Sequence, residues 1–158
     1  MKKQGGFGLV EVIIGLSILA ISFFSLVLVG RNVTKLTVST TRSLQADFLL
    51  EEGIEATRSI RDRGWSASLS ALSGTSSLTF ATSPSRWMVT TTPEIIDDIF
   101  YRTIAVYPVS RDFNDDIVLA GGTPDPNTKK ITTVVSWNTG QATSSISAST
   151  YLTNYFND

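Results

Sequence analysis

The N-terminal part of the chain is dominated by one apolar run. From Phe7 to Gly30 there are 24 residues, and Glu11 is the only ionisable side chain among them. A helix of this length reaches about 36 Å at about 1.5 Å per residue, which is enough to cross a hydrocarbon core of about 30 Å. The pattern therefore predicts a membrane-spanning helix.

A secretory signal peptide is the competing interpretation of this run. Its apolar core would have about 7 to 15 residues, followed by a small-x-small cleavage site. The residues before Arg31 read LVLVG, with Leu28 where a small residue is expected, so we interpret the run as a retained anchor. Lys2 and Lys3 favour a cytoplasmic N-terminus under the positive-inside bias. The cations that follow the run weaken this argument for the orientation.

Helical character continues beyond the apolar run. No proline occurs before Pro84, and Gly64 stands where a C-terminal stop is expected. We therefore expect one long helix over residues 7–63. Gly30 and Gly53 are weak points at which this helix would bend or locally unwind, because glycine is a poor helix former.

The second half of this helix, residues 42–62, has an amphipathic pattern. At roughly 100° per residue one broad face should pack on a folded domain. Its members are Ala46, Leu49, Leu50, Gly53, Ile54, Ala56, Thr57 and Ile60. The opposite face is charged, and a solvated surface is its simplest interpretation. Leu44 and Phe48, spaced i,i+4, lie among those charges and form a candidate contact for a neighbouring subunit.

From Trp65 onward the sequence is rich in Ser, Thr, β-branched residues and turn signals, which predicts strands. The five candidate strands are residues 77–82, 86–92, 99–109, 129–137 and 142–153. We expect the third to end near Pro108. Alternation places Ile131, Thr133, Val135 and Trp137 on one face, and Phe100, Ile104 and Val106 form a similar set. These patterns predict an antiparallel sheet of three to five strands that packs against the helix, which is an α+β fold.

Composition narrows the possible functions. The 158 residues include no cysteine and no histidine, so this sequence cannot build a disulfide, a Ser-His-Asp triad or a histidine or thiolate metal site. The net charge of −1 gives no global basic field for nucleic acid. An enzyme based on carboxylates is one alternative, with Glu94, Asp97 and Asp98 as a conceivable group, although a solvated turn is the simpler interpretation.

The stretch GGFGLVEVIIGLSILAI, residues 5–21, resembles the N-terminal motif of type IV prepilins and type II secretion pseudopilins. That family has a basic leader ending in glycine, then phenylalanine, an apolar run, and glutamate as the fifth mature residue. The resemblance implies a leader at residues 1–6, cleavage between Gly6 and Phe7, methylation of the Phe7 amine, and Glu11 in the fifth position. Gly8 departs from the usual Thr or Ser.

The resemblance also implies the pilin fold and its organisation. The expected parts are the leader 1–6, a membrane and filament-core helix 7–30, its continuation 31–64, and a β-sheet region 65–158. A prepilin peptidase would cut on the cytoplasmic side of the inner membrane. Partners would be related pilin or pseudopilin subunits, an inner-membrane assembly platform and lipid, with no cofactor. The product would be a minor pilin or pseudopilin of a cell-surface pilus or an envelope pseudopilus.

Glu11 needs its own explanation, because a central acidic residue costs on the order of 2.5 to 3.5 kcal/mol on membrane-insertion scales. In one interpretation it complements the helix dipole and its head reaches the interface. In the other, cleavage creates a positive α-amino group on Phe7, and Glu11 pairs with that group on a neighbouring subunit. Pairing within one chain, at i,i+4, is equally consistent with the sequence.

Residues 111–127 are rich in oxygen-bearing side chains. Candidate calcium ligands are Asp112, Asn114, Asp115, Asp116 and Asp125. The spacing departs from the EF-hand loop, which needs glycine where this chain has Ile117. An ordinary turn marked by Gly121, Gly122, Pro124 and Pro126 is the simpler interpretation.

A membrane-anchored binding module is the alternative function. Its sheet region would capture DNA, a secreted protein or a surface. Trp65, Trp87 and Trp137 would be its candidate contacts, although aromatic residues at strand positions usually belong to a core.

Overall fold

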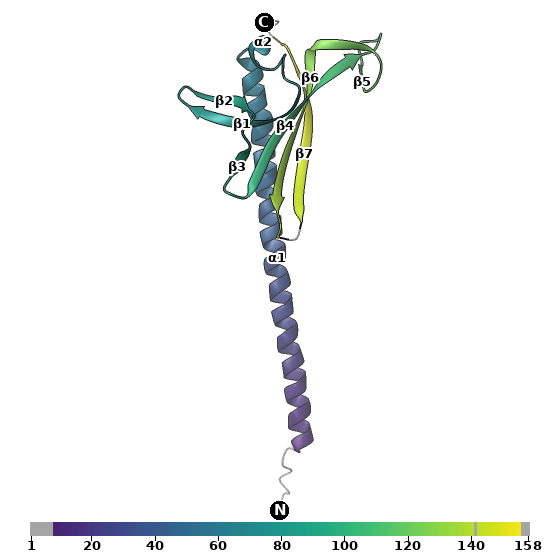
Figure 1. Ribbon diagram of the computed structural model, residues 1–158. Coiled ribbons are helices and arrows are strands. Elements are labelled where there is room, and N and C mark those ends of the chain that lie inside the picture. Colours follow the sequence, from purple (N-terminus) through teal and green to yellow (C-terminus); the bar gives the residue numbers. More distant parts are fainter. Residues whose placement is uncertain (1–7, 141, 156–158) are drawn as a thin grey trace, which may run out of the picture. The chain divides into compact units, whose positions relative to one another are not determined.

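The computed structural model describes residues 8–140 and 142–155 (Figure 1). Helix α1 spans Leu9–Asp62 without interruption, which confirms the prediction of one long helix. It ends one residue before the expected end, and Gly64 follows with φ 143°, a conformation that favours glycine. The chain divides into two compact units, residues 1–42 and 43–158, and α1 contributes to both.

The second unit contains a short helix and an antiparallel sheet. The elements after α1 are α2 Trp65–Ser68, β1 Gly74–Thr82, β2 Ser85–Thr90, β3 Glu94–Ile96, β4 Phe100–Arg111, β5 Ile117–Val118, β6 Thr123–Asn138 and β7 Thr143–Thr153. The strand order is β2-β1-β4-β6-β7, and β3 and β5 each pair with β4. Seven strands exceed the predicted three to five, because β3 and β5 have only three and two residues and leave no periodic pattern.

Strand β1 begins at Gly74, three residues before its predicted start, and β2 ends at Thr90, two residues before its predicted end. Two further strand ends, in β4 and β6, differ from the prediction at prolines. Strand β4 does not end near Pro108 but continues to Arg111, with a shift of its register against β6 between Pro108 and Val109. Proline has no N–H to donate, so an irregularity is where a strand tolerates it. Similarly, Pro124 and Pro126 lie within the first residues of β6 and not in a turn.

The predicted apolar faces of helix and sheet form the core of the second unit. On α1 the buried residues are Ala46, Leu50, Gly53, Ala56, Thr57 and Ile60, all on the predicted face. On β4 and β6 they include Phe100, Ile104, Val106, Ile131, Thr133, Val135 and Trp137, also as predicted. Burial of α1 against the sheet is therefore what removes both amphipathic faces from water.

Gly53 is the point of closest approach between α1 and the sheet. A Cβ placed on Gly53 would lie 2.7 Å from Cγ2 of Thr133 and 3.2 Å from Cδ of Arg102. The absence of a side chain thus lets helix and strand backbones come together. The helix is not unwound at Gly53, because α1 continues through it without interruption. A bend at this residue stays a prediction.

Arg102 connects four elements of the second unit at this same place. Its side chain is 1% exposed, on the helix-facing side of β4. Nε and Nη2 donate to the two carboxylate oxygens of Glu94 in β3, each at 2.8 Å. Nη1 donates to Glu52 Oε2 at 2.6 Å and to the Leu49 carbonyl at 3.1 Å, both in α1. The guanidinium carbon lies 5.2 Å from the ring centroid of Trp87 in β2.

This network changes the interpretation of two acidic residues. Burial disfavours the charged form of Arg102, but its hydrogen bonds with Glu94 and Glu52 and their charges outweigh burial and raise its pKa above the ordinary value. Glu52, expected on a solvated face, and Glu94, considered as a catalytic carboxylate, are both engaged by Arg102. Asp97 and Asp98 form the β3–β4 turn, both with positive φ.

We expect Gly53→Ala to destabilise the second unit by about 1–3 kcal/mol through overpacking against Thr133. This loss should exceed the gain of up to about 1 kcal/mol that alanine brings to a helix interior. Denaturant unfolding of the full chain in detergent, followed by tryptophan fluorescence, would measure it. Gly30→Ala is the matched control, because a Cβ there meets nothing within 4 Å. A stabilised Gly53→Ala variant would contradict the assigned close contact.

We expect Arg102→Met to destabilise the fold by about 3 kcal/mol, because it leaves the 16% exposed Glu94 side chain without its cation. The same unfolding measurement applies. Arg58→Met is the matched control, since Arg58 and Glu55 form an exposed pair that should contribute less than about 1 kcal/mol. Equal losses in the two variants would show that burial of the Arg102 network adds nothing.

Candidate functional site

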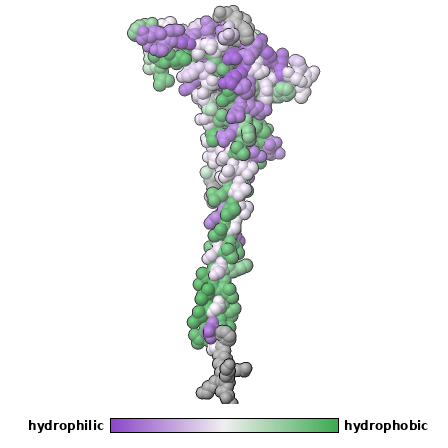
Figure 2. All heavy atoms as spheres, turned by 180° about the vertical axis from the view of Figure 1, so that it is seen from behind, coloured by the Kyte–Doolittle hydropathy of each residue, from purple (hydrophilic) through white to green (hydrophobic). Residues whose placement is uncertain are grey.

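The α1 residues from Leu9 to Val29 form an apolar surface that the other described residues leave uncovered. The large apolar side chains from Leu9 to Val29 are between 40% and 76% exposed. The helix is long and apolar enough to cross a membrane, and its most apolar stretch has no residue buried within the chain. Figure 2 shows the hydrophobic colour along this part of α1. Lipid or other polypeptides must therefore cover it.

Hydroxyl groups in the same helix are already satisfied by its own backbone. Ser17 donates to the Ile13 carbonyl at 2.7 Å, and Ser22 donates to the Ile18 carbonyl at 2.8 Å. Ser25 repeats the contact one turn later. Each hydroxyl donor is thus used within the helix, which suits an environment without water. The carboxylate of Glu11 cannot be satisfied in this way, because the helix backbone offers it no cation.

Glu11 lies in the first turn of α1. Its backbone N–H donates to the Gly8 carbonyl at 3.0 Å, so the helix is already formed at this residue. Among the described residues Glu11 forms no ion pair. Arg31, the next cation along the chain, is about 30 Å away along the helix axis at about 1.5 Å per residue. The predicted cleavage site, Gly6 and Phe7, lies outside the described residues, so pairing with the Phe7 amine stays a prediction.

Leu44 and Phe48 are exposed on α1 in the second unit, at 54% and 62%. They lie away from the buried residues Ala46 and Leu50. Their contact with a neighbouring subunit stays a prediction.

The three tryptophans have different surroundings. Trp65 and Trp137 are 3% and 5% exposed and belong to the core. Trp87 is half-buried between Phe80, whose ring centroid is 5.3 Å away, and Arg102. Two of the three contacts considered for a binding module are therefore unavailable to a partner.

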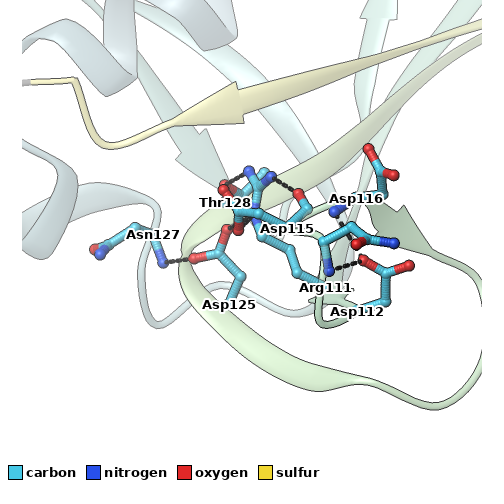
Figure 3. Close-up of polar contacts among 8 residues, drawn as sticks. Arg111, Asp112, Asp115, Asp116, Asp125, Asn127 and Thr128 are labelled. Carbon is cyan, nitrogen blue, oxygen red and sulfur yellow. Dashed lines mark hydrogen bonds and ion pairs between the residues drawn. The ribbon is translucent and has the colours of Figure 1, made fainter.

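The acidic segment after β4 is organised by Arg111 (Figure 3). Nε of Arg111 donates to Asp125 Oδ2 at 2.7 Å, and Nη1 donates to the Asp115 carbonyl at 2.8 Å. Partial burial would raise the pKa of Asp125. Hydrogen bonds from Arg111, Thr128 and the Asn127 N–H outweigh burial and hold that pKa below its ordinary value.

Three of the five candidate calcium ligands, Asp112, Asp115 and Asp125, already have partners within the chain. Asp112 Oδ1 accepts the backbone N–H groups of Asn114 at 2.8 Å and of Asp116 at 3.0 Å. Asp115 and Asp125 face Arg111. Over the described residues, no three acidic side chains are grouped so that they could hold a metal ion. Calcium binding therefore stays a prediction, and the structure explains the acidic residues as turn-forming and arginine-pairing groups.

Sequence reasoning missed Arg102, and it placed Gly53 on the packing face of the helix without identifying its close approach to the sheet. Arg102 occupies an inward position in a strand whose other inward residues, Phe100 and Ile104, are apolar. A cation at such a position indicates a buried partner. Gly53 had no comparable signal, because glycine in a helix does not by itself distinguish close packing from flexibility.

Comparison with protein families gives a match at the N-terminus alone. Residues 1–27 match the family described as "Prokaryotic N-terminal methylation motif". No curated protein and no solved structure matches the chain. The matched segment contains Gly6, Phe7 and Glu11 and the beginning of the uncovered apolar helix. This motif at residues 1–27, followed by an apolar helix and an antiparallel sheet, supports assignment of the chain to the type IV prepilin-like and pseudopilin family.

Proposed function

We propose that the chain is a minor pilin or pseudopilin, a structural subunit of a type IV pilus or a type II secretion-like filament. The methylation motif supports processing by a prepilin peptidase and assembly with other pilin-type subunits. The observation that carries the proposal is the uncovered apolar helix with one carboxylate, Glu11, placed just after the predicted cleavage site. The proposed work is polymer assembly without a chemical step.

Cleavage between Gly6 and Phe7 changes the electrostatics at Glu11. In the uncut chain the nitrogen of Phe7 belongs to a neutral amide. Cutting converts it to an amine with an ordinary pKa of about 7.7–8.0, which is mostly protonated at pH 7 and keeps its charge when methylated. Among packed helices with little water, Glu11 is costly unless such a cation lies beside it. The pair therefore forms only between processed subunits and fixes their register.

Apolar contact alone would not give this specificity. Lipid chains are as apolar as leucine, so exchanging lipid for another helix yields little hydrophobic free energy. Close van der Waals packing and the charge pair must provide the preference for a neighbour. Gly15 has no side chain, and a Cβ placed there would meet nothing within 4 Å, so it offers a small surface for such approach.

The second unit would make the remaining contacts of the subunit outside the membrane. Leu44 and Phe48 are exposed apolar side chains on α1 and fit a lateral contact with a neighbour. We propose that the short N-terminus faces the cytoplasm, that an inner-membrane platform extracts the subunit, and that the product is a surface pilus or an envelope pseudopilus. A binding module that works without assembly is less well supported, since Trp65 and Trp137 are buried.

We expect mass spectrometry of the protein isolated from host membranes to find a mature chain that begins at methylated Phe7. The peptidase should remove residues 1–6 and modify the new amine. Gly6→Leu is the control, because a bulky residue before the cleavage site should leave the leader in place. An intact leader on the wild-type chain, in a host with an active prepilin peptidase, would contradict the proposed processing.

We expect Glu11→Ala to be processed normally but to enter filaments at least about tenfold less well. Loss of one partner of a buried charge pair is worth about 3–5 kcal/mol, and about 1.4 kcal/mol corresponds to tenfold. Immunoblots of isolated filaments and of membranes give the ratio. Glu11→Gln, which keeps the shape without the charge, should behave like Glu11→Ala. Normal incorporation of both variants would favour the interpretation that Glu11 serves only its own helix.

A further inference from the structure

The segment between β4 and β6 presents two apolar side chains to solvent. Phe113 and Leu119 are 95% and 96% exposed, more than any other large apolar residue that the structure describes. The loop that carries them is braced from both sides. Arg111 pairs with Asp115 in the loop and with Asp125 in β6, and a Cβ on Gly122 would lie 2.5 Å from the Arg111 carbonyl oxygen. The two side chains therefore project from an ordered platform.

The same segment is acidic. Residues 111–125 contain four carboxylates and one guanidinium. That guanidinium, on Arg111, is occupied by Asp115 and Asp125. Among the described residues, Asp112 and Asp116 form no ion pair. The loop thus combines two exposed apolar side chains, Phe113 and Leu119, with the negative charges of Asp112 and Asp116, which no ion pair compensates.

A cavity of complementary character lies elsewhere in the second unit. It has a volume of about 510 Å³ and is lined by the end of α1, by α2 and by β2. This volume lies within the range of about 300–1,000 Å³ that is typical of pockets enclosing a bound group. Ile60, Leu72 and Val89 contribute apolar walls, and the charged residues of the lining are Arg63 and Arg86.

Both arginines of the cavity are exposed, and neither forms an ion pair within the described part of the chain. Arg63 donates a hydrogen bond to the Trp87 carbonyl, which leaves its positive charge uncompensated. No residue of the 111–122 loop lines the cavity, so the chain does not fill it with its own loop.

We propose that the 111–122 loop of one subunit docks into this cavity on a second copy of the chain. Phe113 and Leu119 would provide the apolar contact, and Asp112 and Asp116 would face Arg63 and Arg86. Such opposite charges across a contact fix orientation and exclude wrong partners. This inference rests on the proposed function, because it places the subunit in a filament, and it adds that copies of this chain are neighbours there.

The symmetry of this contact suits a polymer. The loop and the cavity are different surfaces of the same chain, so the contact is heterologous. Each subunit inserts its loop into one neighbour and accepts the loop of another neighbour in its cavity. A heterologous contact that does not close into a ring generates an open helical filament. A contact between two identical surfaces would stop at a dimer instead.

Cysteine crosslinking in cells that process and assemble the full-length chain tests the proposal. The chain has no cysteine, so introduced thiols react without background. The double variant Leu119→Cys/Thr91→Cys carries one thiol on the loop and one in the cavity lining. Mild oxidation should give a ladder of disulfide-linked dimers, trimers and higher multimers of this chain. Each single variant should give monomer only.

Matched controls decide what the crosslinks mean. Leu119→Cys/Ser147→Cys, with its second thiol on the exposed face of β7, should give no ladder. Dimers formed by Leu119→Cys alone would overturn the proposal by showing a contact between identical surfaces. A linkage of the double variant to a different protein, or monomer only, would also overturn it.

Charge reversal provides a second readout. Asp116→Arg or Arg86→Glu alone should reduce the ladder about tenfold, because like charges then face each other. The two together should restore it. A combined variant no better than either single variant would overturn the assigned charge pairing.

The outcome for this contact can be told apart from the outcome for the proposed function. A double-cysteine variant that matures at Phe7 and enters filaments without forming a ladder contradicts the loop contact alone. A chain that is neither cut nor incorporated contradicts both.

Discussion

The close approach of α1 to the central strands is the constraint on which the second unit depends. Gly53 lets the helix reach Thr133, and at the same level Arg102 extends to Glu52 on the helix and Glu94 on β3. A buried guanidinium is tolerated only when its hydrogen bonds are satisfied, so this geometry leaves little freedom in how α1 lies on the sheet. The network therefore selects one arrangement among those that apolar packing alone would allow.

A different constraint governs the first unit. From Leu9 to Val29 its helix exposes large apolar side chains that need lipid or another polypeptide to cover them. One carboxylate in such a stretch makes the surroundings selective, because lipid acyl chains offer no cation to match it. In the proposed function the subunit lies in the membrane before assembly and in a bundle of processed copies afterwards.

Patterns of period 3.6 and period 2 predicted much of the second unit. The face from Ala46 to Ile60 and the alternation from Ile131 to Trp137 were predicted correctly, because burying apolar surface dominates the placement of such residues. The pairing of Arg102 with Glu52 was not predictable, since 50 residues separate them and only the packing of α1 on the sheet brings them together. Strands β3 and β5 escaped prediction because neither is long enough to show a period.

The sequence by itself determined the membrane-type helix, the leader-like segment before Phe7 and the place of Glu11, because these are properties of a contiguous run that needs no tertiary contact. Only the tertiary structure decided the roles of residues whose partners lie far along the chain. It assigned Arg102 and Gly53 to the helix–sheet contact, and Trp65 and Trp137 to the core. Burial and hydrogen bonding between distant segments depend on the folded path, which local patterns do not encode.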